Sequence, residues 1–237
     1  MTTKGRAAAI VLAAGGGRRL GTDEPKAFVS IGGRPLVALS AAAAVASPAI
    51  GSLVAAVPQG LEDRARELLA GIDLPVTVVA GGESRQASVA LALRAVSDDV
   101  QVVLCHDAAR PFAPPDLFTA VVDAIDQHVE GAIDGHVDGA IPVVPIADTV
   151  KRVAAGLIVG TESREGLALA QTPQAFRLEA LREAHRRAQE ASVFFTDDAG
   201  VVEWAGYRVA AVQGDPRNFK VTTLADLARA RARVEGG

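Results

Sequence analysis

Residues 8–21 read AAIVLAAGGGRRLG, and Pro25 and Lys26 follow a few positions later. The apolar half of this stretch is typical of a strand buried on both faces. The three glycines after it indicate a loop whose backbone can approach a ligand closely. Exposed backbone N–H groups and nearby cations together bind phosphate, and Arg18, Arg19 and Lys26 supply the cations. The stretch therefore predicts a buried strand that ends in a phosphate-binding loop.

The spacing of this loop excludes two common nucleotide-binding motifs. Gly16 and Gly21 have the spacing of a Walker A motif, but Thr22 and Asp23 replace its Lys-Ser/Thr pair. Leu20 occupies the third glycine position of the dinucleotide fingerprint. An ordinary P-loop NTPase and a Rossmann dehydrogenase are therefore disfavoured.

Short apolar runs alternate with segments rich in Ala, Leu and Arg along the rest of the chain. The expected strands are 7–13, 51–57, 75–80, 101–106, 139–146 and 207–213. The expected helices are 35–46, 60–70, 84–96, 115–130, 177–191, 198–205 and 223–234. This alternation predicts an α/β fold with a mostly parallel sheet between helices, and we expect one domain over residues 1–237. Ligands of such sheets bind beyond the carboxyl ends of the strands.

Composition narrows the class of protein. Hydrophobic residues make up 49% of the 237 residues, which is enough for a core and argues against a disordered chain. The net charge of −4 argues against a broad nucleic-acid-binding surface. No apolar run approaches the ~20 residues of a membrane span, and no secretory signal is evident, so we expect a cytoplasmic protein without a membrane partner. The single cysteine, Cys105, excludes an internal disulfide, and its apolar neighbours predict a buried thiol.

Two segments interrupt the alternation. Residues 147–171 contain short β-like runs separated by glycines, which predicts a hairpin arm outside the sheet. Such a hairpin is marginally stable alone, so we expect it to pack on a second subunit. The Gly- and Asp-rich stretch 131–139 is expected to be a surface loop, with His136 in solvent.

The motif His106-Asp107-Ala108-Ala109-Arg110-Pro111 directly follows an expected strand. A carboxylate at the carboxyl end of a strand is well placed to hold Mg²⁺ or a water of its shell, and Arg110 could bind an anion. A local Asp–Arg ion pair is the alternative interpretation. His106 could act as a general base or have a purely structural role.

Residues 81–88 (GGESRQAS) lie between an expected strand and helix. The glycines would let a flat base lie against the backbone, and a plain turn with Ser84 as the helix cap is the alternative. The later motifs are individually weak. They are Asp148-Thr149-Val150-Lys151, Arg164, Thr172-Pro173-Gln174, Thr196-Asp197-Asp198 and Asn218-Phe219-Lys220-Val221-Thr222.

Taken together, these motifs resemble the 2-C-methyl-D-erythritol 4-phosphate cytidylyltransferase family of the non-mevalonate isoprenoid pathway. They occur in the family's order and span nearly the whole chain. The resemblance implies a Rossmann-like three-layer nucleotidyltransferase fold whose protruding β-arm, 147–171, is exchanged in a homodimer. It also implies Mg²⁺-dependent transfer of CMP from CTP to 2-C-methyl-D-erythritol 4-phosphate, with release of pyrophosphate. A ribitol-5-phosphate or other polyol-phosphate nucleotidyltransferase is the nearest alternative, and a nucleotide-binding regulator without turnover is another.

The same resemblance implies roles for individual residues. Arg19 and Lys26 would clamp the triphosphate, and Arg164 would come from the partner subunit; these three and Lys220 are the expected catalytic residues. Asp107 is the expected metal ligand. The expected nucleotide-binding residues are Ala13, Ala14, Gly15, Gly16, Gly17, Gly82, Arg85 and Ser88, with cytosine near Gly82 and Ser88. The expected residues for the polyol phosphate are Asp107, Arg110, Thr149, Arg164, Thr172 and Lys220.

Overall fold

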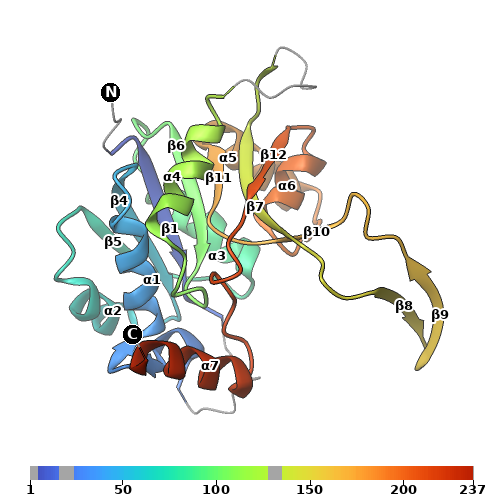
Figure 1. Cartoon of the computed structure of the whole chain (residues 1–237). Coiled ribbons are helices and arrows are strands. Elements are labelled where there is room, and N and C mark those ends of the chain that lie inside the picture. Colours follow the sequence, from blue (N-terminus) through green and yellow to red (C-terminus); the bar gives the residue numbers. More distant parts are fainter. Residues whose placement is uncertain (1–4, 16–23, 128–134, 237) are drawn as a thin grey trace.

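A central sheet organises the computed structural model, which describes residues 5–15, 24–127 and 135–236 (Figure 1). The strand order is β10-β7-β11-β6-β1-β4-β5, and β12 also pairs with β7. All six expected strands are present within one or two residues of the predicted ends. The bounds are β1 (Ala7–Leu12), β4 (Ile50–Val57), β5 (Val76–Ala80), β6 (Val102–Asp107), β7 (Gly139–Pro145), β10 (Ala168–Ala170), β11 (Gln174–Arg177) and β12 (Val209–Gln213).

Most neighbouring strands are parallel. β1 pairs in parallel with both β4 and β6, β5 with β4, and β12 with β7. The exceptions are β10, antiparallel to β7, and β11, antiparallel to β6 and β7. β11 was not among the expected strands, because these four residues begin with Gln174 and end with Arg177 and so lack an apolar run. The predicted α/β fold with a mostly parallel sheet is confirmed.

Helices cover both faces of the sheet, which explains the uninterrupted apolar run of β1. Ala7, Ala9 and Val11 belong to the core on one face, and Ala8 and Ile10 to the core on the other. The first core is closed by α1 (Leu36–Val45), α2 (Glu62–Leu69) and α4 (Pro115–Ala124). The second is closed by α3 (Arg85–Leu93), α5 (Leu178–Glu190) and α6 (Asp198–Trp204). The layers are therefore helix, sheet and helix, as expected.

A third, smaller core lies beyond the carboxyl edge of the sheet, beneath the C-terminal helix α7 (Leu224–Glu235) (Figure 1). α7 begins with a capping box between Thr223 and Asp226. It packs on β2 (Ser30–Ile31), which follows the short helix η2 (Lys26–Phe28) and pairs with β3 (Arg34–Pro35). The members of this core are Val29, Ile31, Leu36, Val221, Leu227 and Ala230.

The arm is an antiparallel hairpin of β8 (Val150–Ala154) and β9 (Leu157–Glu162) that projects away from the sheet (Figure 1). Residues 168–170 return to the sheet as β10, so the free hairpin is shorter than the predicted arm of 147–171. Its turn contains Ala155 and Gly156, both with positive φ. Val153, Leu157, Ile158 and Val159 are all more than half exposed. The arm therefore presents apolar side chains that nothing in the described chain covers.

Two smaller expectations have mixed outcomes. Residues 131–134 of the expected surface loop lie outside the described residues, and His136 is exposed as expected, but Val137 and Gly139 are buried. Cys105 is fully buried, and burial raises the pKa of its thiol well above the usual value. None of the described helices has the length and apolar character needed to cross a bilayer.

Candidate active site

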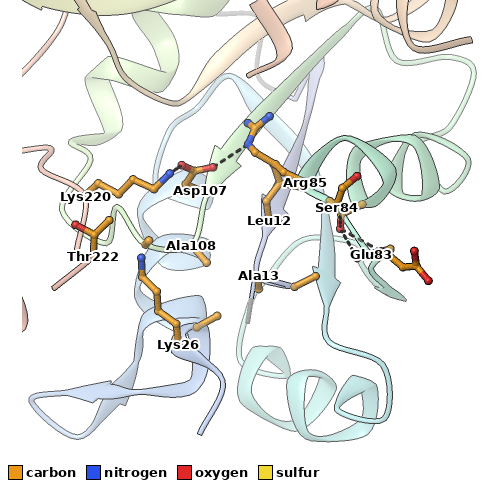
Figure 2. Close-up of a pocket in the computed structure, with 16 residues that line it drawn as sticks. Leu12, Ala13, Lys26, Glu83, Ser84, Arg85, Asp107, Ala108, Lys220 and Thr222 are labelled. Atoms are coloured by element: carbon orange, nitrogen blue, oxygen red, sulfur yellow. Dashed lines mark hydrogen bonds and ion pairs between the residues drawn. The ribbon is translucent and has the colours of Figure 1, made fainter. Parts of the chain in front are cut away.

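A cavity of about 620 Å³ opens at the carboxyl edge of the sheet (Figure 2). Its wall comes from the ends of β1 and β6, the start of α3, the Lys26 segment and the loop before α7. Segments far apart in sequence therefore meet here, at the edge where the sheet topology predicts a ligand. Nine predicted site residues line the cavity: Ala13, Ala14, Gly15, Lys26, Gly82, Arg85, Ser88, Asp107 and Lys220.

Close backbone packing shapes one side of the cavity. The Ala13 amide donates to the Ala56 carbonyl at 2.7 Å, and the Gly81 amide donates to the Val57 carbonyl at 2.7 Å. A Cβ placed on Gly81 would overlap the Cβ of Ala14. The loops after β1 and β5 can therefore touch only because both residues are small.

Ser84 and Ser88 fix the loop that enters α3. Ser84 Oγ accepts a hydrogen bond from the Ala87 amide at 3.0 Å. Ser84 therefore caps α3, as expected for a turn with Ser84 as the helix cap. Ser88 Oγ accepts from the Gly82 amide at 3.1 Å and donates to the Ser84 carbonyl at 2.8 Å. The Ser88 hydroxyl thus holds the Gly82 backbone in the cavity wall.

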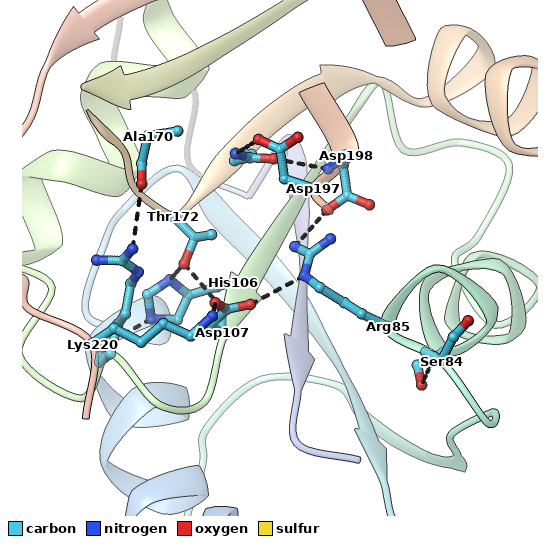
Figure 3. Close-up of polar contacts among 12 residues, drawn as sticks. Ser84, Arg85, His106, Asp107, Ala170, Thr172, Asp197, Asp198 and Lys220 are labelled. Atoms are coloured by element: carbon cyan, nitrogen blue, oxygen red, sulfur yellow. Dashed lines mark hydrogen bonds and ion pairs between the residues drawn. The ribbon is translucent and has the colours of Figure 1, made fainter. Parts of the chain in front are cut away.

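Asp107 lies between two cations at the end of β6 (Figures 2 and 3). Its Oδ2 is 2.6 Å from Lys220 Nζ, and its Oδ1 is 3.3 Å from Arg85 Nε. Burial raises the pKa of Asp107, but the charges of Arg85 and Lys220 outweigh burial and hold this pKa well below its usual range. Asp107 is therefore an ionised carboxylate, and its ion-pair partners are Arg85 and Lys220.

Arg110, the expected partner of Asp107 in the alternative interpretation, makes other contacts. Its Nη1 donates to the Asn218 carbonyl at 2.7 Å, and its Nη2 to the Ala170 carbonyl at 3.4 Å. Asn218 is fully buried and donates to the Thr172 carbonyl at 2.8 Å. Arg110 therefore ties the loop that carries Lys220 to the strand segment before β11. It does not line the cavity.

Arg85 links Asp107 to a second buried carboxylate, Asp198 (Figure 3). Arg85 Nη2 lies 2.7 Å from Asp198 Oδ2, and His185 Nε2 lies 3.3 Å from Asp198 Oδ1. Burial raises the pKa of Asp198, but Arg85 and the hydrogen bond from His185 outweigh it and lower the pKa to about 2. Lys220, Asp107, Arg85 and Asp198 thus form a chain of alternating charge across the site.

Sequence reasoning did not assign site roles to Asp198, His185 or Gln174. Gln174 Oε1 accepts from the amides of Asp198 and Ala199, each at 3.2 Å, so it orients the start of α6. The signal was present in the Thr-Pro-Gln and Thr-Asp-Asp motifs. Nothing in their spacing, however, showed that Arg85 would reach Asp198.

Thr172 fixes the backbone of Asp107 and also contacts the ring of His106. Thr172 Oγ1 accepts from the Asp107 amide at 3.0 Å and lies 3.1 Å from His106 Nδ1. Burial lowers the pKa of His106 to about 4, so its imidazole is neutral at physiological pH. The ring also packs edge-on against Phe118. These contacts support the structural interpretation of His106.

The remaining predicted residues are not in the cavity wall. Thr149 is exposed at the base of the arm, and Arg164 donates to the carbonyls of Ile146 and Ala147 within the same arm. Gly16, Gly17 and Arg19 lie outside the described residues. The roles expected for these residues stay predictions.

Comparisons with known proteins agree with the motifs. A family model described as 2-C-methyl-D-erythritol 4-phosphate cytidylyltransferase matches residues 7–236. A protein of that name from Frankia casuarinae is 47% identical over 96% of this chain and 80% of its own length. Another from Rhodococcus opacus is 43% identical over 99% of this chain and 97% of its own length.

Solved structures give the same result. The crystal structure of 2-C-methyl-D-erythritol 4-phosphate cytidylyltransferase from Thermus thermophilus has a TM-score of 0.78 and 34% identity, covering 96% of this chain and 98% of that one. A 4-diphosphocytidyl-2C-methyl-D-erythritol synthase from Anaerococcus prevotii has a TM-score of 0.82 and 25% identity, covering 97% and 98%. The described cavity therefore belongs to a fold shared with these enzymes over nearly the whole chain.

Proposed function

Because this chain belongs to the 2-C-methyl-D-erythritol 4-phosphate cytidylyltransferase family, we propose that it transfers the cytidylyl group of CTP to 2-C-methyl-D-erythritol 4-phosphate. The products are 4-diphosphocytidyl-2-C-methyl-D-erythritol and pyrophosphate, in isoprenoid precursor synthesis. The observation that carries the proposal is the cavity at the sheet edge, which is lined by Lys26 and Lys220 on one side and by small residues, Ala13 among them, on the other (Figure 2).

The chemistry suits these residues. A phosphate oxygen of the polyol phosphate attacks the α-phosphorus of CTP, the new P–O bond forms, and the bond to pyrophosphate breaks. The attacking phosphate is already an anion near neutral pH, so no strong general base is required. The barrier lies in bringing two anions together and in the charge that grows on the leaving group, and fixed cations lower it. Lys26 would act on the triphosphate, and Lys220 would orient the attacking phosphate.

The residues present also fit a Mg²⁺ ion. Asp107, whose two oxygens pair with Arg85 and Lys220, is an ionised carboxylate in the cavity wall, and a carboxylate oxygen is the ligand type that Mg²⁺ prefers. The described residues contain no cluster of three or more His, Cys, Asp or Glu ligands. When bound, the ion would neutralise charge on the phosphates of CTP.

The nucleotide half of the site follows from the cavity wall. Ala13, Ala14 and Gly15 directly follow β1, and Gly82, whose amide donates to Ser88 Oγ, also lines the cavity. A flat cytosine fits against this small-residue surface, with its triphosphate directed to the cations. Gly16, Gly17 and Arg19 complete the phosphate loop in this proposal.

The arm supports a homodimer. Its exposed Val153, Leu157, Ile158 and Val159 form an apolar surface that a second copy would cover. We infer one catalytic domain per chain, with the arm as its dimerisation segment, and infer that Thr149 and Arg164 act in the partner's cavity. A cytoplasmic location completes the proposal, because CTP is available there.

The test offers each of the four nucleoside triphosphates with 2-C-methyl-D-erythritol 4-phosphate and Mg²⁺, and measures pyrophosphate release. Release with CTP alone, dependent on the polyol phosphate, supports the proposal. Ribitol 5-phosphate in a parallel reaction tests the nearest alternative. Turnover with ribitol 5-phosphate and not with the methylerythritol substrate would replace the proposed acceptor.

A further inference from the structure

The C-terminal helix α7 packs beneath both segments that carry cavity lysines. Val29 and Ile31, shortly after Lys26, share its core with Val221, which directly follows Lys220. Leu227 and Ala230 of α7 fill the space between them. The described part of α7 contributes no residue to the cavity wall itself. Its contact with the site is therefore indirect, through the backbone that holds the two lysines.

Aromatic stacking holds the Lys220 segment against α7. The guanidinium of Arg229 lies over the ring of Phe219 at 4.0 Å from its centroid, and Phe219 is the residue before Lys220. The Phe112 ring centroid lies 5.5 Å from that of Phe219, and Arg233 lies over Phe112 at 5.0 Å. Two arginines of one helix thus clamp two rings of the loops beside the cavity.

Hydrogen bonds fix the other side of Lys220. The Val221 amide donates to the Ala109 carbonyl at 2.8 Å, which ties the loop to the Asp107 motif. The amides of Thr222 and Thr223 donate to Asp226 Oδ2 at 2.9 and 2.8 Å. Lys220 is therefore anchored to α7 on both sides along the chain, although its own side chain is 42% exposed.

The far end of α7 meets the Lys26 segment. Gly32, in the turn between β2 and β3, has φ +57°, and a Cβ at this position would lie 2.5 Å from Val234 Cγ1. Ile31 beside it is buried in the shared core. One rigid helix therefore bears on both lysine segments.

We propose that α7 is a positioning element that sets the placement of Lys220 relative to Lys26, and that Arg229 is a positioning residue for Lys220. The proposal rests on the proposed function for the role of the two lysines in binding phosphates. Without the Arg229 stack, Phe219 loses one side of its support, and the loop that presents Lys220 gains freedom.

The test compares Arg229→Ala with Arg231→Ala, a matched control on the same helix. Arg231 is exposed, and within the described chain it stacks on neither ring. Arg229→Ala is expected to raise the KM for the polyol phosphate about 2- to 5-fold, the range that an exposed cation–π contact supports, with a smaller change in the KM for CTP. Arg229→Lys is expected to recover part of the loss, because it keeps the charge but not the flat stack.

Hydrogen exchange at the Val221 amide gives a second readout that needs no turnover. It is expected to quicken about 2- to 5-fold in Arg229→Ala, with β1 amides and the Arg231→Ala protein unchanged. A lowered Tm with unchanged KM values and unchanged Val221 exchange would overturn the proposal and leave α7 with a role in stability alone. If the unmodified protein releases no pyrophosphate, the proposed function fails, while the exchange measurement still decides the positioning role.

Discussion

The cavity wall and the arm break the usual rule of burial in opposite directions. Asp107 in the wall and Asp198, which pairs with the wall residue Arg85, are charged but buried, whereas the apolar residues Leu157 and Ile158 of the arm are exposed. The buried charges find their partners within the chain, through Arg85 and Lys220. The exposed apolar residues find none in the described chain. The difference is that the buried charges are neutralised within one chain, whereas the apolar side chains of the arm are left uncovered by the described residues.

The most severe change to the wall is expected from Lys26→Ala. Loss of a preorganised charge at a developing anion costs about 10²- to 10³-fold in kcat, so turnover should nearly vanish while the fold persists. Steady-state kinetics and circular dichroism measure the two effects. Lys26→Arg is expected to be damaging as well, because a planar fork replaces a compact charge on a flexible stem. Normal turnover of the alanine variant would remove Lys26 from the site.

Asp198→Asn tests whether the buried charges of the wall depend on one another. The substitution leaves Arg85 with one carboxylate in place of two, and hydrogen bonds to charged groups contribute about 1.5–3 kcal/mol each. We expect the free energy of unfolding to fall by about this amount in urea denaturation. Glu203→Gln, on the same helix but mostly exposed, serves as the control. Equal stability of the two variants would show that Asp107 alone holds Arg85.

For the arm, the double variant Leu157→Asp with Ile158→Asp places charges on the exposed apolar surface. If the proposed dimer forms through the arm, the variant sediments as a monomer and loses activity on the order of 10-fold, because the proposed contribution of Arg164 to the partner's cavity is lost. Glu165→Gln, also exposed in the arm region, is the control. An active monomer would show that the wall needs no second copy.

The smallest effect concerns pH and the helix beneath the wall. Hydrogen bonds from Thr222 and Thr223 lower the pKa of Asp226 to about 2, below its value in the unfolded chain. Its contribution to stability is therefore fully present above about pH 4 and is lost as the pH falls through about 2. Asp226→Ala should cost about 1 kcal/mol near neutral pH, the usual worth of a helix cap. Stability curves of the two proteins that stay parallel down to pH 2 would contradict this assignment.

Sequence reasoning recovered the parts of the fold that local pattern determines. The two-faced apolar run of β1 and the capped start of α3 both follow from residues close in sequence. It missed β11, whose pairing with β6 and β7 depends on distant partners. The ion pair of Arg85 with Asp198 escaped for the same reason, since side-chain contacts between remote segments leave no periodic trace.

The same limit applied to the site. The motifs predicted which residue types form the site and at which edge of the sheet they lie, and nine of the predicted residues line the cavity. For Arg110, the motif alone could not predict which groups its guanidinium contacts. Its charge suggested an anion ligand, yet its donors are directed to backbone carbonyls of two other segments.

The contact between Gly81 and Ala14 has a practical consequence for redesign and for inhibitor resistance. Neither position can accept a larger side chain without pushing apart the loops after β1 and β5. Resistance to a compound bound on this surface would therefore have to arise at other positions. A library aimed at the proposed base subsite would likewise sample positions other than 14 and 81. Glu83, which lines the same cavity with a side chain directed away from that contact, is the more productive position to vary (Figure 2).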